Sequence, residues 1–305
     1  QIGNISFLFD DWKSGTDYVS AWTKNPMDRF PAIENDKLFD SGSYDGKLNT
    51  IAGFNFTAEG TETYAALFGA LDNTTLNGVR LVDCAATGDT AATLAGRLTG
   101  CTVTDCGAYL TTKDGMGASY DMAARREQYR VNGQNTAGGL IAVAENTKIS
   151  TSFGAVDVKG GANNGGLVGQ MSGSTISSCY ATGKVQAPSS SGGLIGSSSG
   201  GAVKDCNSYG RVTADGDSEN GANCGGFVGV HSNTNFSDCA FLQQASYNSN
   251  YGTVSGVTAS AYTTMRKDVT EAEQIGLSTP YLTGLQGHGF PFPLCKNGED
   301  QMMHY

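Results

Sequence analysis

Residues 165–186 read GGLVGQMSGSTISSCYATGKVQ, and the Gly-Leu-apolar-Gly unit that begins at Gly166 recurs along the chain. There are six copies, of which the first two are looser, and they follow one another at spacings of 27, 46, 27, 27 and 33 residues. A unit that returns repeatedly at the same spacing, here 27 residues in three of the five intervals, indicates a repeat architecture. The leading apolar residues of the six copies are Leu67, Leu94, Leu140, Leu167, Leu194 and Phe227.

Two further positions keep the same register in every copy. Twelve residues after the leading residue comes a slot that holds a small residue, usually cysteine, and three residues before that slot is another apolar residue. Six copies with constant internal spacing are a strong sign of a real repeat. The slot holds Val79, Cys106, Ser152, Cys179, Cys206 and Cys239, and the apolar position holds Leu76, Val103, Ile149, Ile176, Val203 and Phe236.

The composition of the repeat favours strands over helices. Short apolar segments alternate with glycine, serine, threonine and asparagine, and 43 of the 305 residues are glycine, a poor helix former. The sequence therefore predicts an all-β fold, a parallel β-helix (β-solenoid) of about 27-residue coils with three strands each and a capping segment at both ends. Equivalent residues of stacked coils would form core ladders at the ordinary strand spacing of about 4.8 Å. One such core ladder is expected to contain Cys106, Ser152, Cys179, Cys206 and Cys239.

The spacings also predict how the chain is organised. Residues 37–244 are expected to form the solenoid, with residues 1–36 as an N-terminal cap or the end of a preceding domain, and residues 245–305 as a C-terminal cap. The spacing of 46 exceeds 27 by 19, which predicts an insertion at residues 113–135 that projects from one corner. The spacing of 33 predicts a short extension that includes residues 215–221.

Charge and hydropathy exclude several classes of protein. The net charge is −10 and the isoelectric point is about 4.7, which disfavours nucleic acid as a partner because phosphate binding needs a basic face. No run of 18 apolar residues is present, so no membrane-spanning helix is expected. The chain begins with Gln1 and shows no export segment, which indicates either that such a segment was removed or that the chain is a fragment.

The repeat resembles the GLUG motif, through GLVG at residues 166–169 followed by TISSCYATGKV at residues 175–185. FDSGSYDG at residues 39–46 is similar to the coil that precedes such repeats, and GFPFPL at residues 289–294 is similar to the end of clostridial surface proteins of this type. GLUG repeats occur in large secreted and surface-attached proteins of bacteria, many from the gut. Many of these proteins are adhesin-like, and some carry peptidase domains directed at immunoglobulin A. The resemblance implies a β-solenoid and an extracellular or cell-surface location, and it brings no catalytic motif.

The cysteines have two interpretations. Slot cysteines on neighbouring coils would lie within disulfide range, but their parallel Cβ vectors favour stacked free thiols. Cys84, Cys101 and Cys224 occupy other positions and could pair, and the pairing of Cys295 is open. No Cys-x-x-Cys and no Cys/His cluster with zinc-ligand spacing is present.

Asp205 and Asp238 form the pair of carboxylates that an enzyme would need. Each precedes a slot cysteine on an adjacent coil, so the two side chains should point outward about 5 Å apart, near the separation found in retaining glycosidases. The simpler interpretation is a hydrated surface ladder. The three histidines have no spacing that suggests a catalytic triad, and we assign no catalytic residue.

A weak calcium site is a further candidate. Asp215, Asp217 and Glu219 alternate in a glycine-containing loop and could supply oxygen ligands. The alternative is a solvated acidic loop, because the glycine and the final glutamate of an EF-hand loop are misplaced. Calcium is the only possible cofactor that the sequence suggests.

The insertion is the best candidate for partner binding. Tyrosine and arginine often dominate interface energetics, and loops on a rigid scaffold often carry binding residues. The alternative is that the insertion folds onto the solenoid and pairs locally with Asp114, Asp121 and Glu127. The candidate binding residues are Tyr120, Arg125, Arg126, Tyr129 and Arg130.

Together these observations favour a non-enzymatic secreted or surface protein, adhesin-like, that binds host glycan such as mucin or a host protein such as immunoglobulin. Two alternatives remain: a β-solenoid enzyme that degrades polysaccharide, and a structural stalk that presents another domain. An enzyme would need a groove with several carboxylates beside exposed aromatic residues. A stalk would need no special insertion.

Overall fold

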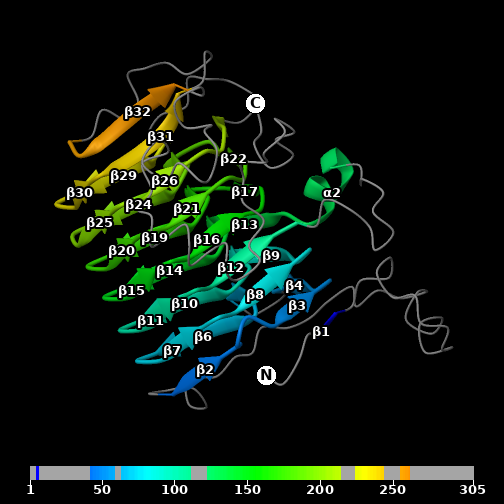
Figure 1. The fold of residues 1–305 in the computed structure, drawn as a ribbon. Coiled ribbons are helices and arrows are strands. Elements are labelled where there is room, and N and C mark those ends of the chain that lie inside the picture. Colours follow the sequence, from blue (N-terminus) through cyan, green and yellow to red (C-terminus); the bar gives the residue numbers. More distant parts are fainter. Residues whose placement is uncertain are drawn as a thin grey trace, which may run out of the picture.

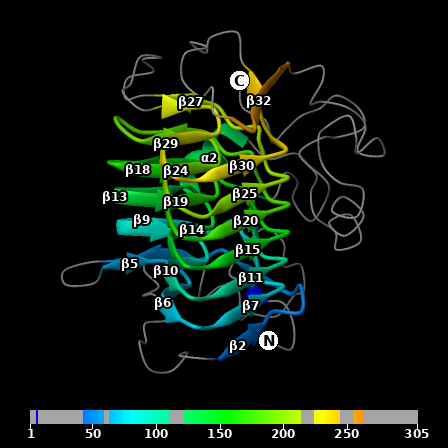
Figure 2. The same cartoon turned by 90° about the vertical axis from the view of Figure 1, so that its left-hand side faces the viewer.

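The computed structural model is a parallel β-helix, as the sequence predicted (Figure 1). The described chain winds through coils whose strands pair in parallel with the equivalent strands of the coils before and after. The coils stack along one axis from the N-terminal to the C-terminal end of the solenoid (Figure 2). The structure describes residues 5–6, 42–58, 63–110, 122–213, 224–243 and 255–261.

The strands form four sheets, which we name A to D. Sheet A contains β1 (Ile5–Ser6), β3 (Thr50–Ala52), β8 (Arg80–Val82), β12 (Gly107–Tyr109), β16 (Phe153–Ala155), β21 (Tyr180–Ala181), β26 (Asn207–Ser208), β31 (Cys239–Gln243) and β32 (Val257–Ala261). Sheet B contains β4 (Asn55–Thr57), β5 (Tyr64–Ala65), β9 (Ala85–Ala92), β13 (Val131–Gly138), β17 (Val158–Gly160), β18 (Asn163–Gly165), β22 (Val185–Gln186), β23 (Ser191–Gly192), β27 (Val212–Thr213) and β28 (Cys224–Gly225). Sheet C contains β6 (Phe68–Asp72), β10 (Ala95–Thr99), β14 (Ile141–Glu145), β19 (Val168–Ser172), β24 (Ile195–Ser199) and β29 (Val228–Ser232). Sheet D contains β2 (Ser43–Asp45), β7 (Thr75–Asn77), β11 (Thr102–Thr104), β15 (Lys148–Ser150), β20 (Thr175–Ser177), β25 (Ala202–Lys204) and β30 (Asn235–Ser237).

The expectation of three strands per coil was wrong, because each coil also contributes to sheet B. In two coils this contribution is a single eight-residue strand, β9 or β13. In the next coil the same stretch is split into β17 and β18, and Gly160 and Gly161 lie at the break between them. This polar and glycine-rich stretch of the coil is therefore a fourth paired face.

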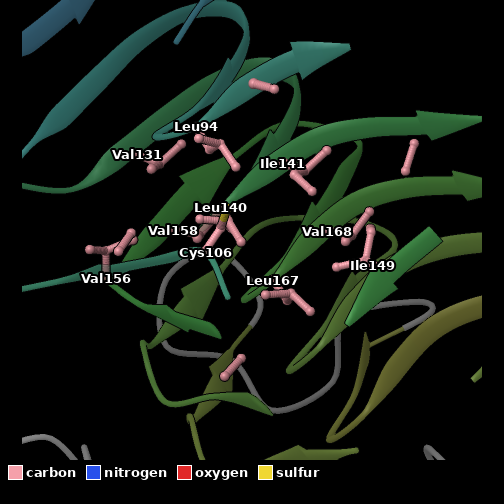
Figure 3. Close-up of a cluster of buried hydrophobic side chains, with 14 of the residues drawn as sticks. Leu94, Cys106, Val131, Leu140, Ile141, Ile149, Val156, Val158, Leu167 and Val168 are labelled. Atoms are coloured by element: carbon pink, nitrogen blue, oxygen red, sulfur yellow. The ribbon is translucent and has the colours of Figure 1, made fainter. Parts of the chain in front are cut away.

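The core inside the coils includes the predicted ladders, together with residues such as Val131, Val156 and Val158 that the sequence analysis did not assign to them (Figure 3). Leu94, Leu140, Leu167, Leu194 and Phe227 are completely buried. The second apolar position is also in register, since Ile149 pairs with Val103 before it and with Ile176 after it. Burial of a side chain of this size contributes roughly 1.5–3 kcal/mol, so the ladders are the main favourable term in the stability of the fold.

The turn between sheets D and A explains why aspartate often precedes the slot residue. The residue at this turn has a positive φ, for example 52° at Ser178, 52° at Asp205 and 53° at Asp238. Aspartate tolerates the left-handed region better than most residues because its short side chain can hydrogen-bond locally. The turn residue directs the following slot residue inward, and Cys106, Ser152, Cys179, Cys206 and Cys239 are all buried.

The expected insertion lies between β12 and β13 and carries the helix α2 (Met122–Gln128) (Figures 1 and 2). Of residues 113–135, residues 113–121 lie outside the described part of the chain. Residues 131–135 belong to β13, which pairs with both β9 and β17. The insertion is therefore shorter at its C-terminal end than expected, because the coil resumes at Val131.

Both segments expected to act as caps add a strand to sheet A. β1 pairs with β3 at one end of the sheet, and β32 pairs with β31 at the other. Within the predicted caps, residues 1–36 and 245–305, the structure describes residues 5–6 and 255–261. These two strands lengthen the sheet at both ends of the stack.

Sheet A also carries a column of aromatic rings, buried except for the half-buried Tyr109, that the sequence analysis missed. The ring centroids of Tyr109 and Phe153 are 6.2 Å apart, those of Phe153 and Tyr180 are 5.1 Å apart, and those of Tyr180 and Tyr209 are 6.5 Å apart. Burial raises the pKa of both Tyr180 and Tyr209. Because Tyr180 and Tyr209 are each 1% exposed, this column is not an accessible binding surface.

Candidate functional site

The helix α2 is attached to the solenoid by a buried ion pair. The Arg125 guanidinium contacts the Asp83 carboxylate, whose side chain is completely buried, while the Arg125 side chain is 9% exposed. The same guanidinium lies 5.2 Å from the centre of the Tyr129 ring, and Tyr129 packs against the hydrophobic core. Arg125 and Tyr129, two of the predicted binding residues, therefore hold the helix against the solenoid.

A second ion pair joins α2 to the turn before β17. Arg126 Nη1 lies 3.6 Å from Asp157 Oδ1, and the Lys184 backbone N–H donates a hydrogen bond of 2.9 Å to the same oxygen. Burial raises the pKa of Asp157, while the charge of Arg126 opposes this shift. Arg126 is only 8% exposed, so most of its side chain is committed to the docking of the helix.

A pocket of about 230 Å³ lies between α2 and the adjoining strands of sheet B. Arg130 contributes to its wall and forms an ion pair with Glu127 one helical turn earlier. Arg130 is 25% exposed at its side chain and Glu127 is 70% exposed. The lining residues are Ala123, Arg126, Glu127, Arg130, Asp157, Val158, Lys159, Lys184 and Gln186.

Only some of the predicted binding residues line this pocket. Arg126 and Arg130 line the pocket, whereas Arg125 and Tyr129 anchor the helix, and Tyr120 lies outside the described residues. Local pairing within the insertion, the alternative interpretation, holds for Arg130 with Glu127. Arg125 and Arg126 pair instead with carboxylates of the solenoid coils.

Sequence reasoning missed the solenoid's own contribution to the pocket, from Asp157, Lys159 and Lys184. A signal was present in the repeat: Asp157 and Lys184 are 27 residues apart, and Lys159 pairs in register with Gln186. Residues at equivalent positions of adjacent coils lie side by side on the sheet. What the repeat did not show is that the helix would fold back over this part of sheet B.

The carboxylates Asp205 and Asp238 occupy left-handed turn positions, as described above. Lys204 Nζ lies 3.8 Å from Asp205 Oδ2. Both aspartates therefore have a structural reason to be present that involves no catalysis.

The candidate calcium ligands Asp215, Asp217 and Glu219 lie outside the described residues. Within the part of the chain that the structure describes, no group of three or more His, Cys, Asp or Glu side chains is arranged to hold a metal ion. The described part also contains no helix long and apolar enough to cross a membrane.

All seven described cysteines are buried free thiols, so Cys84, Cys101 and Cys224, which the sequence allows to pair, form no disulfide. Cys295 lies outside the described residues. Burial raises the pKa of Cys84 and Cys106 to about 12 and also raises that of Cys101, Cys206 and Cys224. Slot thiols donate to backbone carbonyls, as Cys206 Sγ does to Lys204 O at 3.0 Å.

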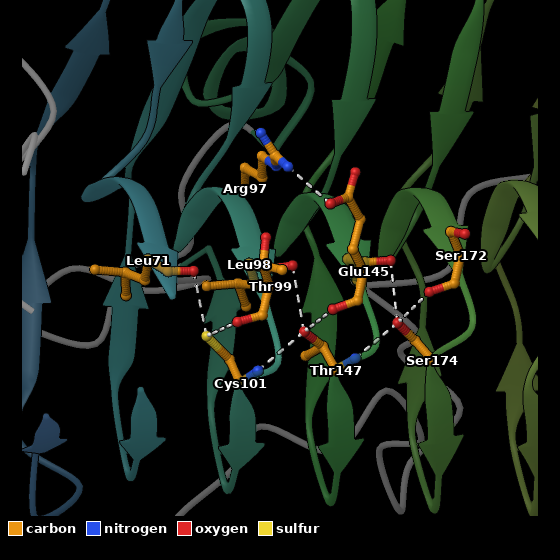
Figure 4. Close-up of polar contacts among 10 residues, drawn as sticks. Leu71, Arg97, Leu98, Thr99, Cys101, Glu145, Thr147, Ser172 and Ser174 are labelled. Carbon is orange, nitrogen blue, oxygen red and sulfur yellow. Dashed lines mark hydrogen bonds and ion pairs between the residues drawn. The ribbon is translucent and has the colours of Figure 1, made fainter. Parts of the chain in front are cut away.

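A second ladder of this kind lies at the turn between sheets C and D (Figure 4). Thr147 Oγ1 donates to Glu145 O at 2.9 Å and lies 3.3 Å from Leu98 O of the preceding coil, and Ser174 Oγ repeats the pattern one coil later. These hydroxyl and thiol groups give the turn carbonyls a second hydrogen bond, since Glu145 O also accepts from the Gly100 backbone N–H at 2.9 Å and Ser172 O from that of Asn146 at 2.8 Å. The ladder consists of Thr74, Cys101, Thr147, Ser174 and Thr234.

The thiols should be unreactive in the native protein. We expect that, in a Cys295→Ala variant, Ellman's reagent labels essentially none of the seven described thiols until the chain is unfolded, because buried, protonated thiols are poor nucleophiles. The measurement is thiol release in native buffer and in guanidinium chloride. Rapid labelling of one or more of the seven thiols without unfolding would contradict this expectation.

The fold and the site together define a parallel β-helix protein with a helix-bearing insertion over one face. No family model and no curated protein sequence matches the chain. A solved structure, the crystal structure of a putative immunoglobulin A1 protease from Bacteroides ovatus, matches with a TM-score of 0.53 and 17% sequence identity. The match covers 76% of this chain and 70% of that chain, and at this identity it shows a shared fold.

Proposed function

We propose that this protein is a non-enzymatic, secreted or surface-attached binding protein, adhesin-like, whose ligand is host glycan such as mucin. The observation that carries the proposal is the pocket between α2 and sheet B. Most coils of the solenoid follow the same 27-residue pattern. Between β12 and β13 the chain adds a helix, a buried ion pair anchors this helix, and a pocket lies between the helix and sheet B. A stalk would need no such addition.

The absence of catalysis is part of the proposal. The two carboxylates that could have served a glycosidase, Asp205 and Asp238, have a conformational reason to be present. The buried thiols have raised pKa values, which do not suit a nucleophile. The extracellular location is supported by the resemblance of residues 166–185 to GLUG repeats.

Host immunoglobulin is a second candidate partner. Its support is the name of the structural neighbour, a putative immunoglobulin A1 protease, together with the shared fold. Because the identity is 17%, the neighbour's name supports a choice of partner to test and no particular residues.

The experiment is a binding assay of the full chain on immobilised intestinal mucin, secretory immunoglobulin A and an unrelated unglycosylated protein, followed by mass spectrometry of the partner. We expect saturable binding to mucin and no cleavage of mucin glycan or of immunoglobulin. The Lys148→Ala variant is a matched surface control, since Lys148 is exposed on sheet D, away from the pocket. The proposed function would be refuted if the chain bound neither mucin nor immunoglobulin A. It would also be refuted if the chain released cleavage products from either of them.

A further inference from the structure

We propose that the pocket between α2 and sheet B binds the acid group of a sugar, a carboxylate or a sulfate ester, with Lys159 and Lys184 as the main cationic ligands. This inference rests on the proposed function and names the ligand class of the same site.

The pocket is locally basic in an acidic protein. Four cationic side chains and two carboxylates line it, which leaves an excess of two positive charges, whereas the whole chain has a net charge of −10. Arg126 and Arg130 each form an ion pair within the wall, with Asp157 and Glu127. Lys159 is exposed and forms no ion pair with any described residue, so its ammonium is available to an anion.

The strand register places the ligand groups side by side. Lys159 on β17 pairs with Gln186 on β22, and Lys184 directly precedes Val185, the partner of Val158. Neighbouring strands are about 4.8 Å apart, so an ammonium and an amide from adjacent coils can contact one small molecule together. The acid group would accept hydrogen bonds from Lys159 and Lys184, and sugar hydroxyls could donate to Gln186 or Glu127.

The size of the pocket favours a single acidic ring. Its volume of about 230 Å³ is below the range of roughly 300–1,000 Å³ that is usual for drug-sized ligands. A protein partner would need a contact area of about 800 Å² on each side, far more than a small hollow supplies. An acidic terminal sugar fits both the volume and the charge, and the rest of the glycan would extend away from the protein.

The test uses isothermal titration calorimetry of the full chain with three probes: sialyllactose, 6-sulfated lactose and lactose. We expect at least one acidic probe to bind more tightly than lactose, and its affinity to fall as salt is raised from about 50 to 500 mM, because ionic screening weakens such contacts. The relative affinity of the carboxylate and sulfate probes distinguishes the two sources of the anion.

The variants test whether binding occurs in this pocket. Lys159→Ala and Lys184→Ala should each weaken the acidic probe by about tenfold, which corresponds to ~1.4 kcal/mol, and Lys148→Ala should leave the affinity unchanged. Circular dichroism and the melting temperature check that each variant is folded.

The inference is overturned if no acidic probe binds better than lactose, or if both lysine variants bind the acidic probe as well as the parent does. Binding to mucin that persists after sialic acid and sulfate have been removed would overturn this inference and leave the proposed function standing. The same holds for binding to immunoglobulin without binding to any acidic sugar. If the parent chain binds neither mucin nor immunoglobulin, both this inference and the proposed function are refuted.

Discussion

We expect the Cys179→Asp substitution to destabilise the protein by several kcal/mol and to prevent folding if the total stability is small. Cys179 is completely buried, and its sulfur lies 3.1 Å from Ser177 O and 4.0 Å from Ile149 O. A carboxylate in this place would direct negative charge at two carbonyl oxygens in a completely buried environment. An uncompensated charge in the interior typically costs several kcal/mol, or the group is forced to remain protonated.

Cys179→Ser is the matched control. Ser152 occupies the same slot one coil earlier, where its hydroxyl donates to Ser150 O at 2.8 Å and accepts from the backbone N–H of Cys106 at 3.1 Å. A serine at position 179 can donate to Ser177 O in the same way, so we expect a loss of about 1 kcal/mol. The measurement is urea unfolding of both variants. Similar small effects of aspartate and serine would contradict the burial of this ladder.

We expect the Asp83→Asn substitution to cost about 3 kcal/mol, because it leaves the Arg125 guanidinium largely buried without its counter-charge. Asp83 has a φ of 50°, and asparagine adopts this conformation as readily as aspartate does, so the change tests the charge and not the backbone. The loss should appear in the free energy of unfolding and as increased proteolysis near α2.

A double-mutant cycle separates the ion pair from other effects. Combining Asp83→Asn with Arg125→Met should cost less than the sum of the two single changes, since the unpaired buried charge is then removed. The exposed pair Arg97–Glu145, at 2.8 Å with side chains 45% and 34% exposed, is the control. Glu145→Gln should cost less than about 1 kcal/mol. Additive losses at Asp83 and Arg125 would show that the pair does not anchor the helix.

The repeat made the solenoid and most of its core predictable. A ladder such as Val103, Ile149 and Ile176 follows from the spacing alone, because residues at equivalent positions of stacked coils must be neighbours. The burial of the slot cysteines followed from the same register. The number of faces per coil was less predictable, since sheet B is built from polar and glycine-rich segments whose composition is typical of turns.

The candidate site was predictable only in part. The spacing of the repeats predicted the insertion that carries α2, and two of its predicted binding residues, Arg126 and Arg130, line the pocket. The sequence could not show that Arg125 would be buried, because its partner Asp83 is 42 residues away and lies in another coil. Residue type alone does not separate an arginine that binds a ligand from one that anchors a helix.

The sequence by itself determined the fold class, the coil length and the residues that form the core ladders, because a repeat fixes which residues are neighbours wherever it is kept. The tertiary structure alone decided how the insertion packs against the coils and which pocket the two form together. α2 interrupts the repeat, so its position depends on the ion pairs of Arg125 with Asp83 and of Arg126 with Asp157. Such contacts between distant segments are specified by three-dimensional packing, and no periodicity in the sequence records them.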